Sequence, residues 1–210
     1  MYLNALDINS AWRRILNRVW YDGWNFRSQR GGTKELYNLL VAVKEPYDKQ
    51  IDGFPMGIKE LEDYAKQLLN PDKKGFEYTY GERIRAWGEG ILNEPVDQLE
   101  EIICRLKKNR NTRRATAVTW IPPVDDRNSE VPCMIMLDFK VRDRKLCLTT
   151  VFRSNDMFGA WPANVFALNK LNHFAASKVK VSAGSITTLS VSAHVYDHDY
   201  QNVQKILGLV

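Results

Sequence analysis

The sequence predicts a single domain of the mixed α/β or α+β class rather than a pure doubly wound sheet. Stretches with apolar residues at helical spacing are interspersed with alternating or mostly apolar stretches, and two of the latter form a hairpin near the middle. A chain of 210 residues, 44% hydrophobic and 26% charged, can bury a sizeable core as one globular domain. No repeat, low-complexity segment or break in composition marks a linker, so we expect one domain over residues 1–210.

The first elements are a helix, a loop and a strand. Apolar residues follow helical spacing over residues 12–20, and Asn9 or Ser10 is the expected N-cap. The glycine-containing segment 26–33 is predicted to be a loop. The run 36–43 is mostly apolar and ends shortly before a proline, which indicates a strand buried on both faces.

Two more helices are predicted before the middle of the chain. One covers residues 58–69, and the other begins at Pro95, a residue favoured at the first helical position. Between them, the segment 76–87 mixes aromatic and polar side chains. Residues 115–120 alternate like a strand, and a proline-rich loop is expected at 122–126.

The second half of the chain is predicted to contain three strands and two helices. Residues 133–141 and 145–153 form the two strands of a hairpin joined by a short turn. A helix follows over residues 161–176, and a strand with alternating side chains covers 186–196. A short helix at 199–207 completes the predicted order.

Charge and cysteine content exclude several classes of protein. The net charge of +5 suits an anionic partner, but it does not distinguish nucleic acid from a nucleotide phosphate. Three cysteines without CxxC spacing argue against a disulfide framework or a zinc site, and they favour a reducing cytoplasm. We expect no metal, no signal peptide and no membrane-spanning helix, because ligand spacing, a basic leader and a run of about 18 apolar residues are missing.

Cys133 is the candidate nucleophile. It follows Val131-Pro132 and begins a predicted strand, so its thiol would lie at the end of a rigid element beside a loop. Thiolates attack electron-poor carbon atoms. An inert, buried cysteine is the alternative, and Cys104 and Cys147 fit that alternative better.

Several positively charged side chains at the ends of elements are candidate phosphate ligands: Arg27, Arg30, Arg113, Arg114 and Arg153. Guanidinium groups bind phosphate through paired hydrogen bonds, and the hydroxyl of Ser154 beside Arg153 can add another. The alternative is solvated surface charge. Gly31-Gly32-Thr33 lacks the Gly-Lys-Ser/Thr ending of a phosphate-binding loop.

Polar groups suited to a sugar and a base occur near the C-terminus. His194 and Tyr196 are two residues apart in a predicted strand, so both rings point to one face and could together bind a sugar hydroxyl. The amide of Asn164 both donates and accepts, as reading the N3–H and O4 edge of uracil requires. A core His–Tyr pair and a helix cap are the structural alternatives.

The order of these residues resembles the thymidylate synthase family. RSNDMFGAWPAN, residues 153–164, is similar to the family's nucleotide-binding signature, and YGERIRAW, residues 80–87, is similar to its YGxxxRAW segment. The arginine pair 113–114, Pro132-Cys133 and His194-Val195-Tyr196 stand at similar spacings. The resemblance covers residues 80–196, and the short chain is similar to archaeal-type members.

The resemblance implies a mixed sheet flanked by helices, a sheet-to-sheet homodimer and a methyltransferase. Cys133 would add to C6 of dUMP, and C5 would then attack the methylene of 5,10-methylenetetrahydrofolate or a methanopterin-type analogue. Tyr80 would handle the C5 proton, and hydride from the cofactor would complete the methyl group. Neither nucleic acid nor a membrane is implied as a partner.

The resemblance also assigns the binding residues. Those that would hold the phosphate are Arg30 (with Arg27 as its rival), Arg153, Ser154 and, from the partner subunit, Arg113 and Arg114. His194 and Tyr196 would hold the sugar. Asp156 would be a catalytic residue near the pyrimidine and the pterin, and Asp156 and Trp87 would contact the cofactor. Glu60 is the chosen general base, with Glu62 as the alternative. Asn164 points to dUMP, because members acting on cytosine nucleotides carry aspartate there.

Two departures from the family pattern leave other functions open. Phe152 replaces a glutamine and removes a polar contact to the base. Val210 follows soon after the His-x-Tyr strand, whereas longer members have a segment that closes over the cofactor. A wetter site would favour a dUMP or dCMP hydroxymethylase, in which water captures the exocyclic methylene. A non-catalytic protein that binds nucleotide or RNA in the same basic pocket is the third possibility.

Overall fold

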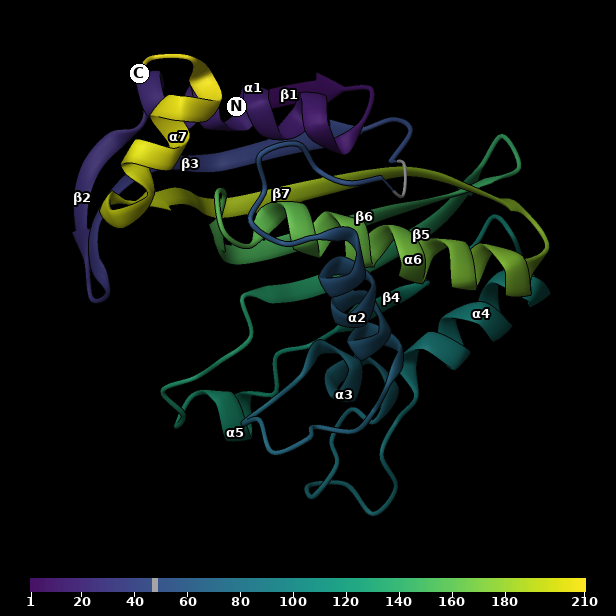
Figure 1. Ribbon diagram of the computed structural model, residues 1–210. Helices are drawn as coiled ribbons and strands as arrows, with labels where there is room; N and C mark the ends of the chain where they lie inside the picture. Colours follow the sequence, from purple (N-terminus) through teal and green to yellow (C-terminus); the bar gives the residue numbers. More distant parts are fainter. Residues whose placement is uncertain (47–48) are drawn as a thin grey trace.

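A mixed sheet forms the centre of the computed structural model, which describes residues 1–46 and 49–210 (Figure 1). The strand order is β1-β3-β7-β6-β5-β4, with β2 paired to β3. The β1/β3 and β6/β7 pairs are parallel and the others are antiparallel. The strands are β1 (Tyr2–Ala5), β2 (Trp24–Ser28), β3 (Gly31–Val43), β4 (Thr116–Val118), β5 (Met134–Arg142), β6 (Lys145–Asp156) and β7 (Ser182–Tyr196). The predicted mixed α/β fold is thereby confirmed.

Helices alternate with these strands along the chain. They are α1 (Ile8–Asp22), α2 (Ile58–Leu69), α3 (Tyr80–Arg85), α4 (Gln98–Lys108), α5 (Pro122–Asp125), α6 (Trp161–Val179) and α7 (Tyr200–Leu207), with a 3₁₀ turn at Asp197–Asp199. None of the helices in the described part of the chain is long and apolar enough to cross a membrane.

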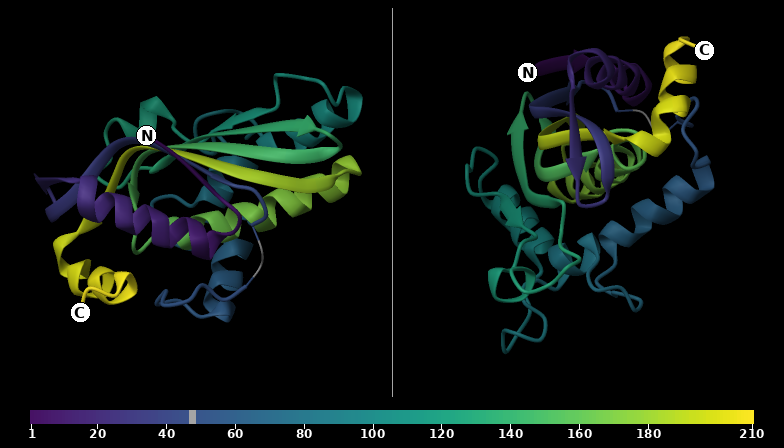
Figure 2. Two further views of the ribbon diagram at one scale, coloured as in Figure 1. Left: turned by 90° about the horizontal axis from the view of Figure 1, so that it is seen from above. Right: turned by 90° about the vertical axis from the view of Figure 1, so that its left-hand side faces the viewer.

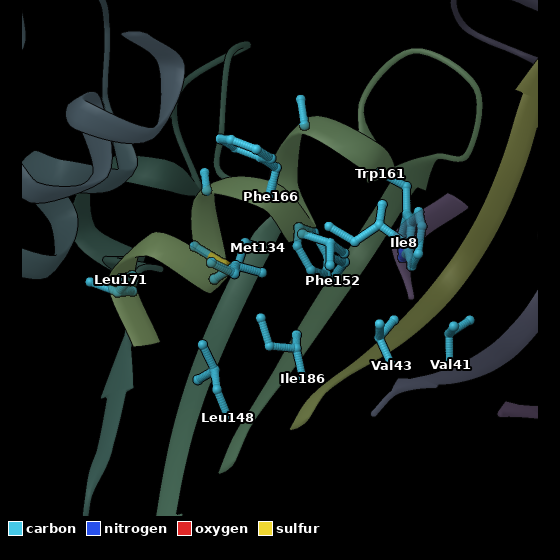
Figure 3. Packing of buried hydrophobic residues seen from close by; sticks show 14 of the residues in the cluster. Ile8, Val41, Val43, Met134, Leu148, Phe152, Trp161, Phe166, Leu171 and Ile186 are labelled. Atoms are coloured by element: carbon cyan, nitrogen blue, oxygen red, sulfur yellow. The ribbon is translucent and has the colours of Figure 1, made fainter. Parts of the chain in front are cut away.

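The main core lies between the sheet and α6. The views in Figure 2 show α1 and α6 on the same side of the strands, and α2 packs against the other side of α6. Because α6 is covered from both sides, most of its residues are buried rather than only one stripe. Figure 3 shows Phe152 of β6 beneath Trp161 and Phe166 of α6, and all three are fully buried.

The opposite face of the sheet remains largely open. Tyr2 is 59% exposed, Val118 42% and Val191 41%. Val151 and Leu189, which are neighbours across β6 and β7, are partly exposed on this face. The described residues therefore leave a partly apolar sheet surface uncovered.

The prediction of a loop at 26–33 is wrong, because this segment forms a β-hairpin. β2 pairs with β3 up to Ser28 and Gly31. Ser28 Oγ donates to Gly31 O at 2.9 Å and accepts from Arg30 N at 3.2 Å, so a side chain stabilises the turn. Gly31 has a φ of +130°, which only glycine adopts readily. Strand β1, which the sequence pattern does not indicate, pairs with the far end of β3.

The strand at 36–43 is correct, but it is not buried on both faces. Leu39, Val41 and Val43 are buried, whereas Leu40 and Ala42 are only partly buried. Helices cover one face of this strand, and the uncovered sheet surface described above includes the other. An apolar run therefore does not prove burial on two sides.

The predicted starts of the first helix, at Asn9 or Ser10, and of the helix at Pro95 are both shifted. Asp7 caps α1, because its Oδ1 accepts from Ser10 N at 2.8 Å while Ser10 Oγ accepts from Asp7 N at 3.2 Å. Asp97 caps α4 through Glu100 N at 3.0 Å, so this helix begins after Pro95. The predicted loop at 122–126 contains the short helix α5.

Candidate active site

Arg153 holds the loop that carries Cys133. Its Nε donates to Pro132 O at 2.9 Å and its Nη2 to Val131 O at 3.1 Å, while Nη2 lies 3.8 Å from Cys133 Sγ. The backbone joins the same segments, since Arg153 N donates to Cys133 O at 2.8 Å. The guanidinium also lies over the ring of Trp120 at 5.9 Å. A positive charge is thus fixed beside a partly buried thiol.

The positive charge of Arg153 lowers the pKa of the Cys133 thiol, but it does not set the sign of the net shift. Burial raises the pKa of Cys133, because a thiolate is poorly solvated in this position. The positive charges of Arg153 and Arg30 lower the pKa, and the negative charge of Glu130 raises it. The pKa of Cys133 therefore lies above its ordinary value, because the effect of burial on the pKa is larger than the opposing effect of the two arginines.

This balance predicts how alkylation of Cys133 depends on pH. In wild type, the midpoint of the iodoacetamide rate should lie above about 8.5, the pKa of a free cysteine. Glu130→Gln should move the midpoint down, because it removes a negative charge that disfavours the thiolate. Arg153→Gln should move it up. Mass spectrometry from pH 6 to 10 measures each rate, with exposed Cys104 as the internal control. Identical midpoints in all three proteins would contradict this electrostatic picture.

Three tyrosines lie on the side of the thiol formed by α2 and α3. Tyr80 Oη accepts from Met134 N, the residue after Cys133, at 3.1 Å, and the ring of Tyr78 meets that of Tyr80 at a centroid distance of 5.8 Å. Burial raises the pKa of Tyr64, Tyr78 and Tyr80, and negative charge on Cys133 raises it further. All three phenols therefore keep their protons near neutral pH.

Close contact between α2 and α3 brings Tyr64 and Tyr80 together. A Cβ on Gly81 would lie 2.0 Å from Gln67 O and 2.1 Å from Asn70 O, so only glycine allows α3 to approach the end of α2. Thr79 caps α3 by accepting from Glu82 N at 3.0 Å. The glycine after Tyr80 therefore has a packing role.

A buried ion pair fixes the other side of α3. Arg83 donates from Nη1 and Nη2 to the two oxygens of Asp125 at 2.9 and 2.8 Å, and Nη1 also donates to Thr119 O at 3.2 Å. The side chains of Arg83 and Asp125 are 4% and 0% exposed. This pair links α3, which carries Tyr80, to α5 and the end of β4.

Asn164 faces the tyrosines from the first turn of α6. Its Oδ1 accepts from Tyr64 Oη at 2.7 Å, and the residue is 7% exposed. It therefore does not cap α6. Tyr64 was not singled out from the sequence, although it stands three residues after Leu61 and four before Leu68 on the buried face of α2. That helical spacing is the signal that could have identified it.

His194, Tyr196 and Asp156 form a second polar group. The rings of His194 and Tyr196 meet edge to face at 4.9 Å, as expected for one face of a strand. Asp156 is the register partner of His194, and its Oδ1 accepts from Phe158 N and Gly159 N at 3.0 and 3.1 Å. Burial raises the pKa of Asp156 and lowers that of His194, while their mutual attraction opposes both shifts.

Comparison with known proteins shows the family to which this chain belongs. A family profile described as "Thymidylate synthase" matches residues 18–208. The chain belongs to the thymidylate synthase family. Proteins described as "Putative thymidylate synthase" are 49% identical over 98% of this chain and 94% of the protein in Methanosarcina mazei, and 39% over 96% of each in Methanothermobacter thermautotrophicus. The one in Methanocaldococcus jannaschii is 32% identical over 95% and 92%.

The arginines of this thymidylate synthase family member lie at three places. Arg30, at the tip of the β2–β3 hairpin, pairs with Glu130 at 2.8 Å and thereby reaches the loop before Cys133. Its rival Arg27 is exposed on β2. Arg113 and Arg114 are exposed before β4, and their side chains make no recorded hydrogen bond or ion pair with any described residue. The structure of one chain does not bring this pair to Cys133.

Three other residues that the sequence analysis proposes for the site make their described contacts away from Cys133. The carboxylate of Glu60 accepts from Gly57 N at 2.7 Å and so caps α2, while Tyr64, one turn later, faces Asn164. Glu62 is exposed on the same helix. Trp87 pairs through its backbone with Val96. These placements describe a single chain and leave the proposed roles of Glu60 and Trp87 as predictions.

A cavity of about 650 Å³ opens beside the three tyrosines. Its lining combines aromatic rings with polar and positively charged side chains: Tyr64, Tyr78, Tyr80, Phe76, Asn70, Gln67, Lys66, Lys74, Asp63 and Thr79. Flat rings can pack against the aromatic part, and the lysines suit an acidic group. Neither Asp156 nor Trp87 is part of this lining.

Proposed function

We propose that this protein converts dUMP to dTMP through a covalent bond between Cys133 Sγ and C6 of the pyrimidine. The observation that carries the proposal is the position of Cys133. Its sulfur lies 3.8 Å from the Arg153 guanidinium, and Tyr80 Oη accepts a hydrogen bond from Met134 N, the residue after Cys133. Negative charge on Cys133 raises the pKa of Tyr64. The hydroxyl of Tyr64 donates to Asn164, the residue suited to bind the O4 and N3–H edge of uracil.

The residues of the chain then have definite roles. Cys133 loses its proton, and the thiolate adds to C6, so that electrons move to C5 and O4. Asn164 donates to O4 as negative charge develops there. After C5 has gained the new carbon, its proton leaves to water oriented by Tyr80, which gives an exocyclic methylene while Cys133 stays bonded to C6. The thiolate would depart from C6 only when that methylene receives the hydride that a bound cofactor would supply. Arg153, Ser154 and Arg30 bind the phosphate, while His194 and Tyr196 hold the sugar.

The tyrosine-lined cavity fits a reduced pterin of the folate or methanopterin type. The rings of Phe76 and Tyr78 offer a surface for a flat heterocycle, and Lys66 and Lys74 lie where an acidic tail could pair. Such a cofactor, when bound, supplies the methylene carbon and the hydride. Asp156 does not line this cavity, and we assign its carboxylate, held by two backbone N–H groups, to the place where the pterin would meet the pyrimidine.

The product of dUMP tests this function directly. Purified enzyme is incubated with dUMP and methylenetetrahydrofolate, and in a separate reaction with dUMP and a methanopterin analogue. The mass of the nucleotide product is measured by mass spectrometry. Methylation adds CH₂ to dUMP, whereas hydroxymethylation adds CH₂O. A methyl product confirms the proposal. A hydroxymethyl product establishes the hydroxymethylase alternative, and unchanged dUMP with no tritium released from its C5 position contradicts both.

We also propose that the active unit is a homodimer formed through the uncovered sheet face. Tyr2, Val118 and Val191 expose a large part of their apolar surface there, and a second copy would bury it. Arg113 and Arg114 of the partner subunit would then complete the phosphate site, which accounts for their exposure in a single chain.

Mixed dimers test whether sites are shared. Arg114→Ala and Cys133→Ala homodimers should each be nearly inactive. The two variants are then unfolded and refolded together, so that about half of the dimers are heterodimers. Each heterodimer has one of its two sites with both residues intact, so about a quarter of the wild-type activity should return. Each variant refolded alone is the control. If the mixture recovers no activity although heterodimers form, the arginine pair does not act across the interface.

A further inference from the structure

We propose that Tyr64 is a positioning residue that sets substrate specificity by fixing the orientation of the Asn164 amide. In the fixed orientation the amide nitrogen faces the bound base, so a C4 carbonyl is accepted and a C4 amino group is rejected. This inference rests on the proposed function and identifies a residue that selects uracil over cytosine nucleotides in that site.

The contact joins two helices at the wall of the cavity. Tyr64 lies on α2 and Asn164 on the first turn of α6, and α2 packs against α6 at a steep angle (Figure 1). The oxygen–oxygen distance of 2.7 Å is typical of a good O–H···O hydrogen bond. Tyr64 also lines the cavity together with Tyr78 and Tyr80. The bond therefore connects the base-reading amide to the tyrosine group around Cys133.

The direction of this hydrogen bond decides the orientation of the amide. An asparagine amide turned by 180° exchanges its oxygen and its nitrogen, so it can present either to a ligand. Tyr64 carries its proton at neutral pH, because burial raises its pKa. Among the residues that the structure describes, Asn164 Oδ1 is the acceptor recorded for this hydroxyl. With the oxygen held by Tyr64, both N–H bonds of Asn164 are left for other partners.

The resulting pattern matches uracil and not cytosine. Asn164 offers Nδ2–H as a donor to a C4 carbonyl and the second lone pair of Oδ1 as an acceptor from N3–H. Cytosine has the reverse pattern, with an amino donor at C4 and an acceptor at N3. To bind cytosine the amide would have to turn over, and Tyr64 would then lose its hydrogen bond to Oδ1. Leaving a buried polar group unpaired is unfavourable.

Removal of the Tyr64 hydroxyl should weaken this discrimination. Calorimetry gives the Kd of dUMP and of dCMP for each protein, and the ratio Kd(dCMP)/Kd(dUMP) is the quantity compared. In Tyr64→Phe we expect the ratio to fall about tenfold, mainly through tighter dCMP binding, since the amide can now turn freely. Tyr21→Phe, at a position 61% exposed on α1, is the matched control and should keep the wild-type ratio.

A double-mutant cycle separates positioning from a general packing effect. In Asn164→Asp the two carboxylate oxygens are equivalent, so Tyr64 has no orientation to fix. Adding Tyr64→Phe to that variant should therefore change the ratio by less than about twofold. An equal fall in both backgrounds would overturn the inference, because Tyr64 would then act without Asn164.

A second pair of variants covers the case in which Tyr64→Phe does not fold. Tyr64→Gln retains a side-chain donor and Tyr64→Met, of similar size, does not. The Gln variant should keep a higher ratio than the Met variant, and equal ratios would contradict the inference.

The wild-type result distinguishes the two proposals. If wild type binds neither nucleotide, the proposed function fails and the role of Tyr64 fails with it. If wild type prefers dUMP and Tyr64→Phe keeps that preference, only the role of Tyr64 is overturned.

Discussion

Replacing Cys133 with alanine should abolish turnover, with a loss on the order of 10⁴-fold or more, as is typical when a covalent nucleophile is removed. Among the residues that the structure describes, the hydrogen-bond partner of the sulfur is Arg153, at the long distance of 3.8 Å. We therefore expect the variant to fold and to bind dUMP with a Kd within about threefold of wild type. Tritium release from C5-labelled dUMP measures turnover, and calorimetry measures binding.

Two comparisons make this result specific. Cys104→Ala removes an exposed thiol on α4 and should keep full activity. Cys133→Ser keeps a hydroxyl of similar size but should remain inactive, because a serine hydroxyl is a much weaker nucleophile without a base to activate it. Substantial tritium release by Cys133→Ala would refute the covalent mechanism. Absence of release in wild type, together with unchanged nucleotide binding, would instead favour a non-catalytic binding protein.

Replacing Asp125 with alanine should lower the free energy of unfolding by about 3 kcal/mol, the lower end of the usual cost of breaking a buried ion pair, because Arg83 keeps the buried carboxylate of Glu82 at 3.0 Å as a second partner. The side chains of Arg83 and Asp125 are 4% and 0% exposed, so the guanidinium would lose two hydrogen bonds in a place that water does not reach. Asp125 also accepts from Ile121 N at 2.6 Å, and that backbone group would lose its partner. Urea denaturation measures the change.

The matched control is the exposed pair Arg18–Asp22 on α1. Its atoms are also 2.8 Å apart, but its side chains are 46% and 37% exposed. Asp22→Ala should therefore cost less than about 1 kcal/mol. If both variants lose the same stability, burial does not determine the strength of the Arg83–Asp125 pair. Activity of Asp125→Ala should fall too, because the pair holds α3 and hence Tyr80 beside Met134.

The sequence by itself determined most of the elements and the order of the site residues. Helices such as α2 and α6 and strands such as β6 and β7 follow from residue spacing within one segment, and that information is local. Cys133, Arg153 and Asn164 could be selected because an ordered set of residues resembles a family signature. The alternation in β7 was also enough to place His194 and Tyr196 on one face.

The tertiary structure decided what those residues touch. Tyr64 and Asn164 are 100 positions apart, so no local pattern contains their hydrogen bond. The packing of Gly81 on the end of α2 and the Arg83–Asp125 pair depend on segments that meet only after folding. The sign of the Cys133 pKa shift is of the same kind. An arginine beside the thiol favours a lower pKa, but burial depends on every atom that covers the sulfur, and its effect on the pKa outweighs that of the charge.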